Sequence, residues 1–359
     1  MRLGLERAGV EVVWANDIDA AKQEMYEANF GSDDFELGDI RDVDPEQIPD
    51  VDIATASFPC TDLSLAGNRK GLGAQAAPKG AYWESSMFWE FLRVIEHLGE
   101  RRPPTLLLEN VLGFATSNQG RDLVIAIGQL NRLGYSCDVL TVNALHFVPQ
   151  SRPRLFIVAT RAPIERSLAP VSDVRPAWVA KLADRNPELS LHALPLPRLP
   201  EGPSSLDEQV ERLARTDPMW WDAERVARFR ESLSPVQCDR VAALVAGAST
   251  SWRTAYRRTR EGVARWEIRA DGIAGCLRTA RGGSSKQALV EAGHGELRVR
   301  WMTAKEYAAL QGAPDFILPR RRNQALFGFG DAVCVPVIAW LVEHAVEPVA
   351  RREALPLAA

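Results

Sequence analysis

The chain has 359 residues, 46% of them hydrophobic, and a formal net charge of −4. This length suffices for a large α/β core with a second, smaller lobe, and the charge excludes a protein that is basic over its whole surface. We find no run near the roughly 20 apolar residues of a membrane span and no signal peptide, so we expect a cytoplasmic protein without a membrane partner.

The five cysteines are odd in number and widely spaced: Cys60, Cys137, Cys238, Cys276 and Cys334. They offer neither a disulfide framework nor a CxxC metal pair, so we expect no metal site. At least four of them are interpreted as buried, unreactive thiols.

The first 160 residues alternate between strand and helix patterns. We expect strands at residues 11–15, 51–56, 105–108 and 155–159, and helices at residues 20–29, 87–98 and 123–133. Gly134 follows the last helix as a C-terminal cap. Strands separated by helices of this length predict an α/β fold with a parallel, doubly wound (Rossmann-like) sheet.

The composition changes after about residue 161, where proline, tryptophan and arginine become more frequent. Residues 161–270 are therefore expected to form an inserted, irregular lobe. Helical patterns return at residues 303–311 and 335–346.

Several polar residues follow the expected strands. Ligands of a doubly wound sheet bind beyond the carboxyl ends of its strands, so we expect these residues along one rim: Asp17, Asp39, Cys60 and Glu109. Helix capping is an equally good interpretation of Asp17 and Asp39 taken alone.

Cys60 ends the segment Phe58-Pro59-Cys60 at a predicted strand end. The glycine-rich segment that follows carries Arg69 and Lys70, and nearby cations favour the nucleophilic thiolate. Taken alone, a Pro-Cys pair is more often a buried structural cysteine.

Glu109 ends a strongly apolar strand, so burial is expected to raise its pKa and to make it a proton donor. A cap or a structural salt bridge is the alternative. In the segment 150–154, alternation points Gln150, Arg152 and Arg154 toward one side, although a solvated basic turn has the same pattern.

Taken in order, these segments resemble the DNA (cytosine-5) methyltransferase family of the bacterial, restriction-modification type. The resemblance rests on Gly38-Asp39-Ile40, Phe58-Pro59-Cys60, Glu109-Asn110-Val111 and Gln150-x-Arg152-x-Arg154, and near the end on the segments 303–312 and 330–333. It covers residues 1–160 and roughly 271–342.

The resemblance implies methyl transfer from S-adenosyl-L-methionine to C5 of a cytosine flipped out of duplex DNA. Cys60 would add to C6 of the base, Glu109 would contact N3 and the exocyclic amine, and Arg154 would support O2. Arg152 and Gln150 would brace the site.

The same resemblance implies a cofactor site at Asp17, Ile18, Asp39 and Ile40, with further members at Pro59, Ser86, Met87, Asp331, Ala332 and Val333. Residues 1–160 would form the catalytic and cofactor-binding domain. Residues 161–270 would form the target-recognition lobe, residues 271–345 would return to the catalytic domain, and residues 346–359 would be a tail.

DNA contacts are expected from the loop after Cys60 and from a basic-aromatic cluster in the lobe, namely Ser64, Arg69, Lys70, Arg253, Arg257, Arg258 and Arg260. A solvated arginine face over buried tryptophans is the alternative for the cluster. The implied partners are double-stranded DNA and a cognate restriction endonuclease, and we expect a monomer.

Three features depart from the family pattern. Residues 1–9 resemble the helix after the family's glycine loop, so the first strand and that loop are expected to be missing. Either the start lies upstream or another segment supplies the strand. Asp331 stands where the family has asparagine, and its charge is expected to weaken cofactor binding. Around residues 276–279 the alignment of the family's threonine is ambiguous.

Two other functions remain open at this point. One is a transfer RNA cytosine-5 methyltransferase, and the other is a non-catalytic DNA-binding homologue or truncated form. A nicotinamide-linked oxidoreductase is disfavoured because the chain lacks the phosphate-binding glycine fingerprint.

Overall fold

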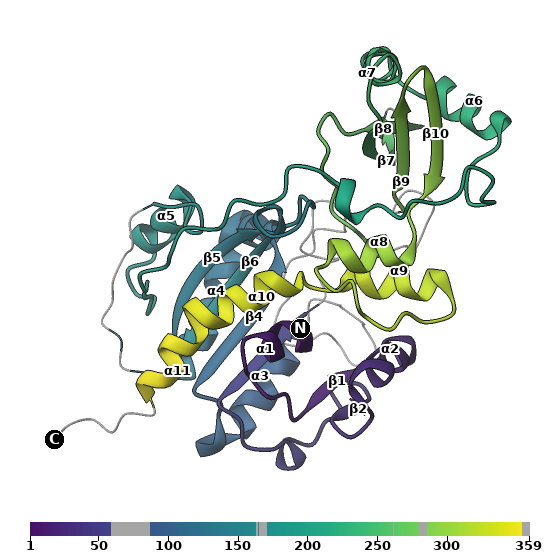
Figure 1. Cartoon of the computed structure of the whole chain (residues 1–359). Coiled ribbons are helices and arrows are strands. Elements are labelled where there is room, and N and C mark those ends of the chain that lie inside the picture. Colours follow the sequence, from purple (N-terminus) through teal and green to yellow (C-terminus); the bar gives the residue numbers. More distant parts are fainter. Residues whose placement is uncertain (59–86, 163, 165–170, 261, 280–285, 354–359) are drawn as a thin grey trace.

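The computed structural model describes residues 1–58, 87–162, 164, 171–260, 262–279 and 286–353. Figure 1 shows a larger body around a central sheet and a smaller lobe at the upper right. The helices α8 (Ala304–Leu310) and α9 (Arg322–Asp331) lie between the two.

The central sheet has the described strands β3 (Ile53–Ser57), β4 (Thr105–Val111), β6 (Pro153–Thr160) and β5 (Ser136–Asn143), in that order. β3 and β4 are parallel, whereas β6 is antiparallel to both β4 and β5. The sheet is therefore mixed, and the prediction of an all-parallel sheet was wrong. Only residues 144–152 join β5 to β6, and a parallel crossover needs a dozen residues or more.

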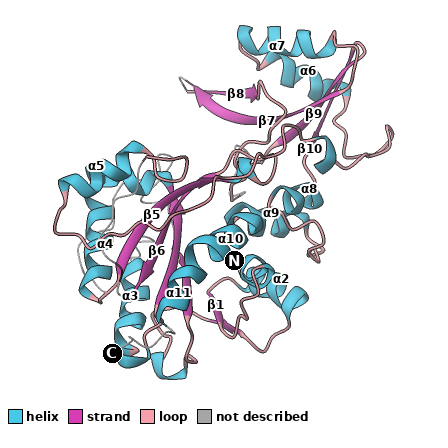
Figure 2. Cartoon of the chain, turned by 60° about the vertical axis from the view of Figure 1, so that its left-hand side comes forward, coloured by secondary structure: helices cyan, strands magenta, loops and turns pink. Residues whose placement is uncertain are grey.

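Helices cover both faces of this sheet, as the doubly wound prediction requires (Figure 2). On one face, α3 (Met87–His97) and α4 (Arg121–Arg132) pack against Leu106 and Leu108. On the other, α1 (Arg2–Arg7) and α10 (Val335–Leu341) pack in one cluster with Leu107, and α11 (Glu347–Glu353) continues the C-terminal helical stretch. This alternation of neighbouring leucines follows from the two-residue period of a strand.

Close packing joins the first helix to α10. A Cβ atom at Gly4 would lie 2.5 Å from the Cβ of Ile338, so a larger residue would push α1 away from α10. The helix expected at the start of the chain is thus present and packed.

β1 (Ala15–Asp17) and β2 (Phe35–Leu37) form a separate, parallel two-stranded sheet beside α2 (Ala20–Phe30). The strand expected at residues 11–15 lies later in the chain than predicted. The side-chain amide of Asn16 donates hydrogen bonds to the backbone oxygens of Glu36 and Gly38, both at 3.0 Å, which favours pairing at residues 15–17.

The smaller lobe has a regular, antiparallel sheet in the order β10-β9-β7-β8. Its elements are α6 (Ala223–Glu231), α7 (Pro235–Val245), β7 (Ser251–Arg260), β8 (Val263–Ile268), β9 (Ala288–Gly293) and β10 (Glu296–Trp301). The prediction of an irregular lobe was therefore wrong. The strand β9 lies beyond residue 270, so the predicted boundary cuts through one sheet.

The first part of the predicted lobe packs on the central sheet instead. α5 (Ala177–Arg185) and the segment after it contribute Ala183, Leu189 and Leu191 to the same apolar cluster as α4. Arg175, which lies two residues before α5, forms a buried ion pair with Asp138 of β5 and fixes the start of this part of the chain.

The remaining described helical segments are 3₁₀-helices, apart from η7, which is a π-helix. They are η1 (Pro45–Gln47), η3 (Gly99–Arg101), η4 (Leu112–Gly120), η5 (Ala144–His146), η6 (Asp207–Gln209) and η7 (Val342–Val346). α8 confirms the helix expected at residues 303–311. Its N-cap is Thr303, which forms a capping box with Glu306.

Among the described residues, one helical stretch, Arg322–Arg351, has the length and composition of a membrane span, with a mean hydropathy of 2.0 in its apolar window. Of that window, 67% is buried inside the protein. The stretch contains α10, which packs on the central sheet, so its apolar character matches that of a core helix.

Candidate active site

A cavity of about 1870 Å³ lies between the two parallel strand pairs. Every residue of β1 and every residue of β3 contributes to its wall. Since neighbouring side chains of a strand point to opposite faces, the strands border the cavity with their edges. Within the described part of the chain, the two sheets are thus separated by this cavity.

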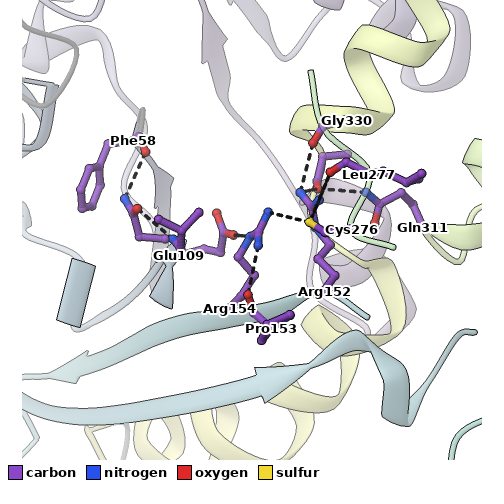
Figure 3. A network of polar contacts seen from close by, with 12 residues as sticks. Phe58, Glu109, Arg152, Pro153, Arg154, Cys276, Leu277, Gln311 and Gly330 are labelled. Atoms are coloured by element: carbon purple, nitrogen blue, oxygen red, sulfur yellow. Dashed lines mark hydrogen bonds and ion pairs between the residues drawn. The ribbon is translucent and has the colours of Figure 1, made fainter. Parts of the chain in front are cut away.

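Glu109 and Arg154 meet on one wall of this cavity (Figure 3). The antiparallel register of β4 and β6 pairs Val111 with Arg154, which brings the guanidinium next to the carboxylate two residues earlier in β4. Arg154 Nε lies 2.9 Å from Glu109 Oε1, and Glu109 is only 8% exposed. A structural salt bridge was one alternative considered for Glu109 from the sequence, and the structure shows such an ion pair, with Arg154.

Asn110 connects this wall to the end of β3. Its side-chain amide donates a hydrogen bond of 3.2 Å to the backbone oxygen of Phe58, and both residues are buried. The Phe58 ring packs edge-on against Phe114, with ring centroids 5.6 Å apart. The backbone two residues before Cys60 is therefore fixed next to Glu109.

Six predicted site residues lie outside the described residues, namely Pro59, Cys60, Ser64, Arg69, Lys70 and Ser86.

Arg152 directly precedes β6 and connects the central sheet to two segments from the C-terminal part of the chain, around residues 277 and 330–332. Its guanidinium donates hydrogen bonds to the backbone oxygens of Leu277 (2.7 Å), Gly330 (3.2 Å) and Ala332 (2.6 Å). Gln150 is fully buried, accepts from the Leu277 amide and donates to the Leu310 oxygen. Both residues therefore fix backbone segments that border the cavity. Arg152 itself lines the cavity, whereas Gln150 does not.

The residues expected to bind the cofactor line the same cavity wherever they are described. These are Asp17, Ile18, Asp39, Ile40, Met87, Asp331, Ala332 and Val333. Asp17 ends β1, and Asp39 follows β2. Hydrogen bonds from Arg41 lower the pKa of Asp39. The N-cap of α2 is Asp19 rather than Asp17, so capping does not account for Asp17.

Lys22 is a site residue that the sequence analysis missed. Its ammonium lies 3.2 Å from the Asp17 carboxylate and 3.5 Å from that of Asp331. Burial opposes the charge, but these carboxylates raise the pKa of Lys22. Thr279 also donates a hydrogen bond to Asp331. The signal in the sequence was a lysine in the first turn of the helix after Asp17.

Of the residues proposed from sequence for DNA contact, those that the structure describes lie along β7. Arg257, Arg258 and Arg260 are exposed, and the last two form ion pairs with Glu267 of β8. Arg253 is half-buried and donates to the Trp252 oxygen.

The tryptophans of this region belong to the lobe core. Trp266 packs against Trp221, Phe229 and Trp301, and it is 8% exposed. The aromatic half of the basic-aromatic cluster is therefore structural, as in the alternative considered from the sequence.

Comparisons with known proteins identify the family to which the chain is related. The model of the family described as C-5 cytosine-specific DNA methylase matches residues 1–347. The type II methyltransferase M.NgoBI of Neisseria gonorrhoeae is 39% identical over 159 residues, which are 44% of this chain and 46% of that protein. M.HhaI of Haemophilus parahaemolyticus is 35% identical over 161 residues, 45% of each chain. The chain thus spans about half the length of the curated relatives it matches.

The fold is shared with solved methyltransferases. The structure of the Dnmt2 methyltransferase of S. pombe has a TM-score of 0.58 and 18% identity, and the match covers 97% of this chain and 95% of that one. The match confirms a doubly wound α/β fold.

Proposed function

Because the chain belongs to the C-5 cytosine-specific DNA methylase family, we propose that it transfers a methyl group from S-adenosyl-L-methionine to C5 of cytosine in a specific duplex DNA sequence. The observation that carries this proposal is the Glu109–Arg154 ion pair in the wall of the cavity. It lies near the end of β3, which the hydrogen bond from Asn110 to Phe58 holds in place.

The Glu109–Arg154 pair matches one edge of the cytosine ring. O2, N3 and the exocyclic amine lie side by side on that edge, so a guanidinium can meet O2 while a carboxyl group meets N3 and the amine. Both groups stabilise the charge that builds on N3 and O2 when a nucleophile adds to C6.

Cys60 is the proposed nucleophile. Its thiolate adds to C6, which makes C5 electron-rich enough to accept a methyl group. The C5 proton then leaves to a base, the C6–S bond breaks, and the thiolate is restored. A cytosine inside a duplex must first be flipped out of the stack.

The cavity suits the proposed cofactor. Ile18 is 58% exposed and offers an apolar surface, and Asp17 and Asp39 in the same cavity wall supply acceptors for hydroxyl and amine groups. Bound there, S-adenosyl-L-methionine would supply an electrophilic methyl group. Met87, Ala332 and Val333 would contribute the remaining apolar contacts.

The lobe is the proposed recognition element for duplex DNA. Its exposed arginines, Arg257, Arg258 and Arg260, would contact phosphates or base edges. A cognate restriction endonuclease, a monomeric state and a cytoplasmic location belong to the same proposal.

A methyl-transfer assay tests the proposal. Radioactive methyl groups from the cofactor are expected in duplex DNA and not in transfer RNA. Glu109→Gln should lower kcat by about 100-fold, because it removes the proton-donating group at N3. Methylation of transfer RNA alone would overturn the choice of substrate, and an unchanged kcat for Glu109→Gln would overturn its role.

A further inference from the structure

A second cysteine, Cys276, lies in the wall of the same cavity. It belongs to the segment between β8 and β9 and is partly exposed. Figure 3 shows its sulfur between the guanidinium groups of Arg152 and Arg154. The distances are 3.4 Å to Arg152 Nη1 and 3.8 Å to Arg154 Nη2.

Both of these contacts use the sulfur as an acceptor. A guanidinium carries only N–H donors, so each arginine donates to Cys276 Sγ. The third contact, 3.4 Å to the Leu277 oxygen, would use the thiol proton. Ionisation of Cys276 gives up that contact and strengthens the other two.

The surrounding charges also favour a thiolate. Arg152 and Arg154 bring two positive charges into a buried region, and Glu109 supplies one negative charge. Arg278, two residues after Cys276 in the chain, adds a further positive charge. Burial opposes ionisation, but Arg152, then Arg154 and Arg278, lower the pKa of Cys276.

The expectation of at least four buried thiols was wrong, because Cys238 is exposed and Cys276 is partly exposed. Cys137 and Cys334, which are buried, differ from Cys276. Burial raises the pKa of Cys137 and raises that of Cys334 to about 12. Cys276 therefore differs from them in its arginine neighbours and in its access to the cavity.

We propose that Cys276 is a positioning residue of the active site, whose sulfur anchors Arg154 on the side opposite to Glu109. Arg154 then contacts a carboxylate at Nε and a sulfur at Nη2, in addition to the Pro153 backbone oxygen, to which its Nη1 donates at 3.0 Å. This proposal rests on the proposed function, in which Arg154 supports O2 of the cytosine. Cys276 itself does not bond to the base.

Alkylation provides a test that does not depend on methyl transfer. In the full chain carrying Cys60→Ser, iodoacetamide would convert the Cys276 thiolate to a thioether with release of iodide. Peptide mass spectrometry would follow the reaction from pH 6 to 10 (about the range in which thiols titrate), with the exposed Cys238 as the internal reference.

We expect Cys276 to react at a lower pH than Cys238, and Arg154→Gln to raise the pH at which Cys276 reacts. Failure of Cys276 to react below the pH of Cys238, or no effect of Arg154→Gln, would overturn the proposal.

Steady-state kinetics provide the second readout. Cys276→Ala should lower kcat by about tenfold with little change in the cofactor KM, because Arg154 loses an anchor rather than a ligand contact. Cys276→Ser, which keeps an acceptor, should recover part of the loss, and Cys238→Ala should match the wild type. An unchanged kcat for Cys276→Ala would contradict the proposal. If the wild type shows no methyl transfer while the alkylation result holds, the proposed function fails and the link between sulfur and Arg154 stands.

Discussion

Lys22 changes the interpretation of Asp331 at the scale of single residues. From the sequence, the charge of Asp331 was expected to repel the carboxylate of the cofactor, so that Asp331→Asn would tighten binding. The structure places the Lys22 ammonium between Asp331 and Asp17, and this ammonium offsets the extra charge. The aspartate and the lysine therefore act as a pair, and neither can be judged alone.

We predict that Lys22→Met weakens cofactor binding and that Lys22→Met/Asp331→Asn recovers most of the loss. The side chains of Lys22 and Asp331 are 36% and 43% exposed, so their coupling should be modest, about 0.5–1 kcal/mol. Calorimetric titration with S-adenosyl-L-methionine over the four proteins of the double-mutant cycle measures it. Additive effects of the two substitutions would contradict the coupling.

At the scale of elements, the connection from the lobe to α8 rests on a buried ion pair. Arg300 of β10 and Glu306 of α8 are 0% and 1% exposed and lie 2.5 Å apart. Arg300 also donates a hydrogen bond of 3.0 Å to the backbone oxygen of Glu211. This pair fixes the orientation of β10 at the point where the chain leaves the lobe.

We predict that Glu306→Gln lowers the free energy of unfolding by about 3–5 kcal/mol, because it leaves the Arg300 charge buried without its counter-ion. Glutamine retains the capping box of α8, so the loss would report the charge rather than the cap. Urea denaturation followed by circular dichroism measures this change. Arg228→Ala, which breaks an exposed pair with Glu224, is the matched control and should change stability by less than about 0.5 kcal/mol. A similar small change for Glu306→Gln would contradict the prediction.

At the scale of the whole molecule, the periodic helices and apolar strands were predictable from the sequence. α2, α3 and α4 lie within one or two residues of their predicted ranges, because each has local capping or apolar periodicity. The strand β5 was missed, and with it the antiparallel hairpin that makes the central sheet mixed. The direction of β6 follows from its short connection to β5, so the antiparallel pairing could not be predicted once β5 had been missed.

The lobe was the least predictable part of the fold. Its strands are rich in arginine and tryptophan, and the basic-aromatic cluster of residues 252–269 was interpreted as a DNA-contact surface, with an arginine face over buried tryptophans as the alternative. In the structure Trp252 and Trp266 are buried, and Trp266 and Trp301 pack together in the lobe core. The cavity residues were predicted better, because strand ends converge at one rim. Contacts between distant segments, such as that of Lys22 with Asp331, could not be predicted, because no local sequence pattern indicates which segments meet in space.

The most direct test of the account is covalent capture of Cys60 on DNA. The chain would be incubated with S-adenosyl-L-methionine and duplex DNA containing 5-fluorocytosine at its target site. A base cannot remove fluorine from C5 as it removes the proton, so the C6–S bond does not break and the enzyme stays attached to the DNA. We predict a denaturation-resistant adduct that peptide mass spectrometry maps to Cys60 and that is absent from Cys60→Ser. An adduct on another cysteine, or undiminished methylation by Cys60→Ser, would contradict the account.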